Sequence, residues 1–318
     1  MCLYPRLVPN PKYKANKKNN GNIPELKDER LRLVAIGCGN CEQCRKMKAR
    51  EWQVRLQEEI KNKINKHFVT LTFSDESIKT LSTEIGDNEA NDIASLAVSR
   101  FTERWRKKYK KAPRHWLITE LGHPTKQGKG RSTERLHIHG IILEKTNIEE
   151  LTKIWGYGWV HIGYSCDAQT INYCIKYITK VDTDHKGYGA KIFASKGLGK
   201  EYIKTSNKKG NEYKKNNTNE TYRLSNGAKT ALPIYFRNKI YSKEEREYLW
   251  LEKLDKNVRY IGKSKFNMNN ERDRKEFYIK LEFEQRQDEA RGYGDDSKEW
   301  KKQSYEATLN DLNKKKLK

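Results

Sequence analysis

The stretch Leu136-His137-Ile138-His139-Gly140-Ile141-Ile142-Leu143 is apolar apart from two histidines, and it predicts a buried β-strand. Side chains alternate across a strand, so His137 and His139 point to one face together with Ile141. The other face carries the apolar side chains Leu136, Ile138 and Ile142. We expect that second face to pack into the core. The two imidazoles would supply two thirds of a divalent-metal site.

Further strands are predicted on both sides of this stretch. Residues 68–73 are rich in β-branched and aromatic side chains, residues 114–121 precede the histidine strand, and residues 159–164 follow it. The Gly- and Lys-rich residues 122–131 predict a hairpin with a long basic loop. Strands that are neighbours in the sequence and joined by hairpins indicate a mainly antiparallel sheet.

Helices are predicted to cover this sheet. Residues 42–62 and 91–110 carry apolar side chains at helical spacing, with Lys, Arg and Glu on the outer face. A short helix is predicted to end at 155, and Asp167 can cap a helix that contains residues 173–180. The chain is therefore expected to have the α+β class, with an antiparallel sheet flanked by helices.

Composition predicts four regions along the chain. Residues 1–65 combine a proline-rich, extended N-terminal arm with a cysteine cluster and a helix that packs on the core. Residues 66–200 form the core itself. Residues 201–240 are a basic, Asn- and Gly-rich linker. Residues 241–318 form a helical, basic C-terminal region that opens with a capping box at Ser242.

The charge of the chain points to a polyanionic partner. Among 318 residues, 66 Lys and Arg face 42 Asp and Glu, which leaves a formal charge of +24. No apolar run approaches the roughly 18 residues of a spanning helix, and the N-terminus lacks the apolar stretch of a secretion signal. We therefore expect no membrane partner and a cytoplasmic location.

Glu120 is the candidate third metal ligand. It stands near the end of the strand that precedes the histidine strand, so a hairpin would bring it beside His137 and His139. One carboxylate and two imidazoles suit Mg²⁺ or Mn²⁺ when phosphate oxygens supply the remaining ligands. An ordinary charge at a strand end, and histidines buried for packing alone, are the alternative interpretations.

Two tyrosines and two lysines recur at a spacing of four residues. Tyr173 and Tyr177 share one helical face, and each is followed three residues later by a lysine, Lys176 and Lys180. An attacking phenol needs nearby positive charge, and lysine can neutralise charge that develops on a phosphate. The pattern therefore indicates two nucleophiles for phosphodiester chemistry, although aromatic pairs at this spacing also serve packing.

Cysteines gather near the N-terminus. Cys38, Cys41 and Cys44 are each separated by two residues, and Cys2 can supply a fourth thiolate to a tetrahedral zinc site. Free buried cysteines are an equal alternative, and an iron–sulfur cluster is a third.

Together these motifs resemble those of the HUH endonucleases, and within them the rolling-circle replication initiators of the Microviridae, especially the gokushovirus branch. Residues 68–73 resemble the family's first motif, residues 136–140 its metal motif, and residues 173–180 its two-tyrosine motif. The segments 38–45 and 119–122 also resemble this branch. The similarity spans most of the chain.

The resemblance implies an HUH-type plate with a five-stranded antiparallel sheet and a metal that polarises the scissile phosphate. It implies that Tyr173 or Tyr177 nicks single-stranded DNA at the phage origin, leaving a 5′-phosphotyrosyl adduct and a free 3′-OH. That hydroxyl would prime the host DNA polymerase in the host bacterial cytoplasm. Because the sequence contains no G-x-x-x-x-G-K-[ST] phosphate loop, a host helicase would have to unwind the duplex.

Two other interpretations stay open. An HUH relaxase or transposase would share the metal and the tyrosine but act on transfer or mobile DNA. A non-catalytic nucleic-acid-binding protein would use its histidines and cysteines only to hold structural zinc.

Overall fold

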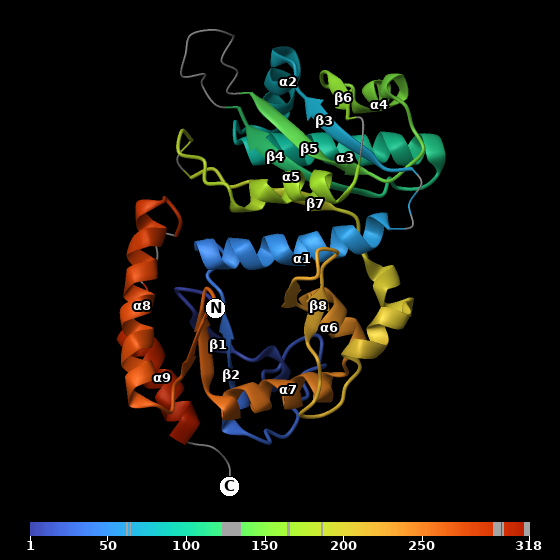
Figure 1. Cartoon of the computed structure of the whole chain (residues 1–318). Helices are drawn as coiled ribbons and strands as arrows, with labels where there is room; N and C mark the ends of the chain where they lie inside the picture. The colour runs from blue at the N-terminus through green and yellow to red at the C-terminus, as the bar shows by residue number, and fades with distance from the viewer. Residues whose placement is uncertain are drawn as a thin grey trace. The chain divides into compact units, whose positions relative to one another are not determined.

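The computed structural model describes residues 1–61, 63, 65–122, 135–163, 166–185, 187–294, 300 and 302–314. The chain falls into two compact units (Figure 1). One unit is Ala49–Thr205. The other combines Met1–Lys48 with Ser206–Lys318.

A five-stranded sheet forms the centre of Ala49–Thr205. Its strands are β3 (His67–Thr72), β4 (His115–Leu121), β5 (Leu136–Ile142), β6 (Val160–Ile162) and β7 (Ile192–Ala194). The strand order is β6-β3-β5-β4-β7, and all neighbours are antiparallel. The predicted α+β class and antiparallel sheet are confirmed, and the histidine strand β5 is its central strand. The predicted loop at 122–131 lies, from 123 on, outside the described residues.

Helices cover both faces of this sheet (Figure 1). The helices are α1 (Glu42–Ile60), α2 (Asp75–Ile85), α3 (Ala90–Tyr109), α4 (Ile148–Trp155) and α5 (Ala168–Thr179). One apolar cluster joins α2, α3 and α4 to the face that carries Leu136, Ile138 and Ile142. That face was predicted to be core, and it is. The second cluster joins α5 and the C-terminal part of α1 to the face of Ile141.

Local sequence explains where α5 begins and how closely β4 and β5 approach. Asp167 caps α5, as predicted, by accepting hydrogen bonds from the backbone of Gln169 and Thr170. A Cβ atom on Gly140 would lie 2.2 Å from the carbonyl oxygen of Trp116. Glycine at this point therefore lets the histidine strand pair tightly with β4.

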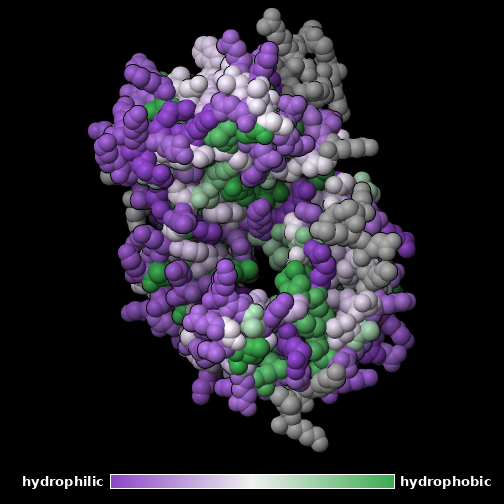
Figure 2. Space-filling view, turned by 180° about the vertical axis from the view of Figure 1, so that it is seen from behind, coloured by the Kyte–Doolittle hydropathy of each residue, from purple (hydrophilic) through white to green (hydrophobic). Residues whose placement is uncertain are grey.

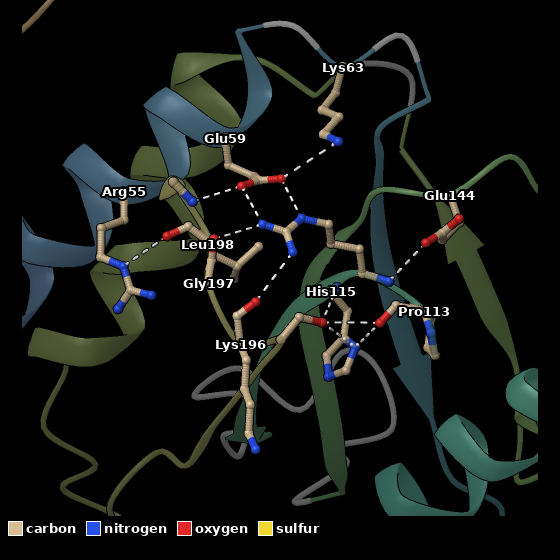
Figure 3. Close-up of polar contacts among 12 residues, drawn as sticks. Arg55, Glu59, Lys63, Pro113, His115, Glu144, Lys196, Gly197 and Leu198 are labelled. Carbon is tan, nitrogen blue, oxygen red and sulfur yellow. Dashed lines mark hydrogen bonds and ion pairs between the residues drawn. The ribbon is translucent and has the colours of Figure 1, made fainter. Parts of the chain in front are cut away.

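A buried ion pair holds the C-terminal part of α1 against the sheet (Figure 3). The Glu59 carboxylate, with its side chain 3% exposed, accepts from Arg114 Nη2 at 2.7 Å and from the Gly199 N–H at 2.7 Å. The Arg114 guanidinium also donates to the carbonyl of Gly197 at 2.9 Å. Three chain segments thus meet at one carboxylate.

The second unit is built from short hairpins and helices. Its strands pair as β1 (Arg6–Pro9) with β2 (Leu33–Ile36), β8 (Thr221–Arg223) with β9 (Lys229–Ala231), and β10 (Val258–Ile261) with β11 (Ser264–Asn267). Its helices are α6 (Ile234–Ile240), α7 (Lys243–Lys256), α8 (Glu271–Ala290) and α9 (Lys302–Lys314). The expected helical C-terminal segment is confirmed, and Ser242 forms the predicted capping box. The residues predicted as an arm contain β1, and those predicted as a linker contain β8, β9 and α6.

The surface is strongly hydrophilic. Figure 2 shows hydrophilic side chains over most of the visible face, consistent with 34% charged residues in the chain. In the described ranges, no helix combines the length and the apolar composition that crossing a bilayer requires.

Candidate metal and tyrosine site

Three side chains converge on one face of the sheet. Glu120 on β4 pairs directly with His137 on β5, and His139 follows two residues later on the same face. Glu120 Oε2 lies 3.1 Å from His137 Nε2 and 3.0 Å from His139 Nε2. The three candidate ligand atoms all lie within 4.8 Å of one another. The expected hairpin thus brings the carboxylate to the histidines.

The other ring nitrogen of each histidine has a partner. His137 Nδ1 lies 2.9 Å from the carbonyl oxygen of Arg135, so Nδ1 carries the proton and donates it to that oxygen. His139 Nδ1 lies 3.0 Å from Thr70 Oγ1, which is in register with it on β3. Partners of this kind leave Nε2 as the lone-pair donor toward a metal. Sequence reasoning missed Thr70, although strand alternation placed it on the histidine face.

Glu120 stays charged in this environment. Burial opposes its charge, but hydrogen bonds from His137, His139 and Lys180 outweigh burial and hold the pKa of Glu120 well below its usual range. Lys180 Nζ lies 2.5 Å from Oε1, the oxygen that faces away from the histidines. Burial lowers the pKa of His139, which favours its neutral imidazole. A charged carboxylate oxygen and two imidazole nitrogens form a donor set that fits a divalent cation.

The two tyrosines on α5 lie against this cluster. The Tyr177 hydroxyl donates to the Tyr173 hydroxyl at 2.6 Å, which confirms that the pair shares one helical face. The Tyr177 ring is stacked on His139, with centroids 5.1 Å apart and planes 13° apart, and Tyr173 meets the same imidazole edge-on at 5.9 Å. Tyr173 is 40% exposed, whereas Tyr177 is 5% exposed. Of the two, Tyr173 therefore offers its hydroxyl more freely to a bound strand.

The two lysines have different surroundings. Lys176 Nζ lies 3.9 Å from the centre of the Tyr173 ring and 5.1 Å from that of Tyr177. Lys180 instead pairs with Glu120. Burial, the bond to Tyr173 and the charge of Glu120 raise the pKa of Tyr177, so Tyr177 keeps its proton.

The four cysteines form a second cluster, in the other compact unit. The Sγ atoms of Cys2 and Cys41 lie 3.9 Å apart, those of Cys38 and Cys44 lie 4.0 Å apart, and all four lie within 4.8 Å of one another. The cluster packs on apolar residues of β11 and α8. It therefore joins residue 2, the start of α1 and the C-terminal helices within one unit.

Backbone N–H groups point at two of these sulfur atoms. Cys2 Sγ accepts from the N–H of Tyr4 at 3.3 Å and of Cys38 at 3.2 Å, and Cys38 Sγ accepts from the N–H of Cys41 at 3.3 Å. Donors of this kind favour thiolates. The arrangement is therefore a candidate metal site with four sulfur ligands.

Comparison with protein families finds one match in the sheet-containing unit. Residues 66–182 match the family model of the replication-associated protein ORF2, also described as the gene 2 protein. The matched range contains the three-residue metal cluster and both tyrosines, and this match supports a rolling-circle replication initiator. Comparisons with curated proteins and with solved structures gave no match.

Proposed function

We propose that this chain initiates rolling-circle replication by nicking single-stranded DNA at an origin through a tyrosine, and later rejoins the strand. The observation that carries the proposal is the pair of bonded tyrosine hydroxyls beside the Glu120–His137–His139 cluster. The whole arrangement lies within the residues that match a replication-associated family.

The reaction is a transesterification that needs no further reactant. The tyrosine oxygen attacks the scissile phosphorus and forms a phosphotyrosyl bond, while the bond from phosphorus to the 3′ oxygen breaks. The proton lost by the phenol is balanced by the proton that the released 3′ oxygen takes up. The products are a 5′-phosphotyrosyl adduct and a free 3′-OH, and attack by a 3′-OH on the adduct rejoins the strand.

We infer that Tyr173 attacks first. Its hydroxyl is the exposed one, and it accepts the hydrogen bond that Tyr177 donates. That donated bond stabilises negative charge on the Tyr173 oxygen, and the ammonium of Lys176 lies beside the same ring. Tyr177 would act in the second transfer, once the adduct has displaced its partner hydroxyl.

We infer that Glu120, His137 and His139 hold Mg²⁺ or Mn²⁺. A bound divalent ion polarises a phosphate oxygen and offsets charge that develops on it. The protein contributes the orientation: Lys180 fixes the Glu120 carboxylate, Thr70 fixes the His139 ring, and the stacked Tyr177 fixes α5 against the ligands. HUH-type chemistry with both tyrosines is the form of the reaction that this arrangement fits.

For the cysteine cluster we infer a structural zinc ion. Bonds of about 2.3 Å from zinc to sulfur in a tetrahedron require sulfur atoms about 3.8 Å apart. The two measured separations, 3.9 and 4.0 Å, are close to that value. The ion would fasten Cys2 to the segment that leads into α1.

The partners follow from the same proposal. They are single-stranded DNA at a phage origin of the Microviridae type, a host helicase, and the host polymerase that extends the 3′-OH in the bacterial cytoplasm. The basic residues between 200 and 230 would add phosphate contacts, which strengthen binding without choosing a sequence.

The test is covalent capture. Labelled single-stranded fragments that cover the cognate phage genome are incubated with the protein and Mn²⁺, then separated under denaturing conditions. One fragment should yield a protein–DNA species, and His139→Ala should remove it, whereas His67→Ala, a histidine of β3 outside the cluster, should retain it.

The rival functions give different results in the same assay. DNA binding without a covalent species from any fragment would favour the non-catalytic binder. A covalent species formed only on conjugative-transfer or mobile-element DNA would favour the relaxase or transposase.

A further inference from the structure

Trp159 is an exposed tryptophan on a rigid backbone. Its side chain is 85% exposed, whereas the other six tryptophans of the chain are buried or half-buried. Its carbonyl oxygen accepts two hydrogen bonds from Thr72, from N at 2.9 Å and from Oγ1 at 3.0 Å. A Cβ atom on Gly158 would lie 2.6 Å from the Thr72 carbonyl oxygen, so the chain passes β3 closely here. The backbone is fixed while the indole remains in solvent.

Strand geometry places this indole on the same face as the metal cluster. The bond from Thr72 continues the ladder in which Val160 pairs with Leu71, and both of these side chains belong to the apolar cluster under α3 and α4. Because side chains alternate, Trp159 points to the opposite face, which is the face of His137 and His139.

The pairing also places Trp159 in one row with two of the candidate ligands. Across the sheet, Trp159 lies beside Thr72, Thr72 pairs with His137, and His137 pairs with Glu120. Neighbouring strands are about 4.8 Å apart, so the backbones at 159 and 137 are separated by about 10 Å. At about 3.4 Å per nucleotide in a stacked strand, this distance covers about three nucleotides.

We propose that Trp159 is a stacking platform for a base of the single-stranded DNA, about three nucleotides or fewer from the phosphate held at the metal cluster. This inference rests on the proposed function for the identity of the strand. An isolated exposed aromatic side chain is common on protein surfaces. Trp159 differs because it shares a row and a face with the candidate ligands.

The chemistry of the surroundings selects single-stranded DNA as the occupant. Every base has a flat π-face, and an indole on a fixed backbone stacks on it with little loss of conformational entropy. The formal charge of +24 attracts the phosphates without recognising bases. Trp159 therefore adds the contact that distinguishes a strand with bases from a strand without them.

The experiment compares two fluorescein-labelled probes by anisotropy, in buffer without added divalent ions. One probe is (dT)12 and the other is an abasic 12-mer with the same phosphates. The wild-type chain should prefer (dT)12. Trp159→Ala should weaken binding of (dT)12 by about 5- to 150-fold, the range for loss of one stacked base, with binding of the abasic probe unchanged. Trp159→Phe should retain most of the preference.

The matched control is Tyr260→Ala, which removes another exposed aromatic side chain, 47% exposed on β10. It should leave the binding of both probes at the wild-type level. The salt dependence of (dT)12 binding should keep its slope in Trp159→Ala, because stacking releases no counterions.

Two outcomes would overturn the inference. One is wild-type affinity of Trp159→Ala for (dT)12, and the other is an equal loss for both probes. Since no step of this test needs nicking, absence of a covalent adduct would refute the proposed function and leave the stacking result intact. An adduct formed normally by a protein without base preference would refute the stacking platform alone.

Discussion

The hydrogen bond between the two tyrosine hydroxyls can be removed with little change in packing. Tyr177→Phe keeps the ring that is stacked on His139 and removes only the group that donates to Tyr173 at 2.6 Å. A hydrogen bond of this kind contributes about 0.5–1.5 kcal/mol. If it stabilises charge on the attacking Tyr173 oxygen, its loss should slow the first cleavage about 2- to 13-fold. Tyr173→Phe removes the nucleophile and should slow that step far more.

The assay separates the first cleavage from the complete cycle. Initial rates of adduct formation are measured on a fresh single-stranded origin with Mn²⁺, and a second origin strand is then added to follow transfer. Tyr177→Phe should form the adduct and fail to complete the transfer, while the double variant should form no adduct. In the wild-type protein the tyrosine should be mapped to the 5′ phosphate, and a polymerase should extend the 3′-OH.

Several results would contradict this reasoning. An adduct in the double variant would exclude both tyrosines as nucleophiles, and a 3′-linked adduct in the wild-type protein would exclude the mechanism. A complete cycle by Tyr177→Phe would reduce Tyr177 to a packing residue. A first cleavage that is faster in Tyr173→Phe than in Tyr177→Phe would reverse the inferred order. Tyr109→Phe on α3 provides a control for loss of a hydroxyl away from the cluster.

Four further predictions concern the metal sites, the basic segment and the buried ion pair. His139→Ala should abolish metal-dependent nicking while cooperative unfolding persists by circular dichroism. Elemental analysis after anaerobic purification should find about one zinc ion per chain, and chelation should lower the unfolding temperature. Replacing the exposed Lys209, Lys214 and Lys215 with Gln should reduce the salt slope of DNA binding by about one per lost phosphate contact. Glu59→Gln should cost about 3 kcal/mol in the free energy of unfolding at neutral pH, because Arg114 is left without its charge partner. The arginine and the Gly199 N–H, against opposing burial, lower the pKa of Glu59, so this difference should shrink as the pH falls through that lowered pKa.

The central part of the sheet could be predicted because its patterns are local. Alternation along the stretch 136–143 identified the histidine strand and its buried face, and a capping residue located the start of α5. β7 was missed because Ile192–Ala194 is too short to show a period. α2 was missed although Ser74 caps it, since the strand signal just before it ended the pattern that was followed.

Interactions over long sequence distances could not be predicted in the same way. Nothing in the local sequence of Met1–Lys48 indicates that it folds with Ser206–Lys318. The spacing of Lys176 and Lys180 suggested equal roles beside a phosphate, but the reach of each side chain depends on the neighbouring sheet. Lys180 reaches Glu120, whereas Lys176 lies over the tyrosine rings.

His139 joins the two halves of the candidate site. Its Nδ1 contacts Thr70, its Nε2 lies toward Glu120, and its ring carries the stacked Tyr177. His137 instead has a backbone carbonyl at Nδ1 and meets His139 edge-on. The same imidazole thus sets the ligand position on the sheet and the position of the nucleophile helix. A ligand and a nucleophile placed by one shared side chain keep their separation when either element moves, which suits an in-line attack on a phosphate held between them.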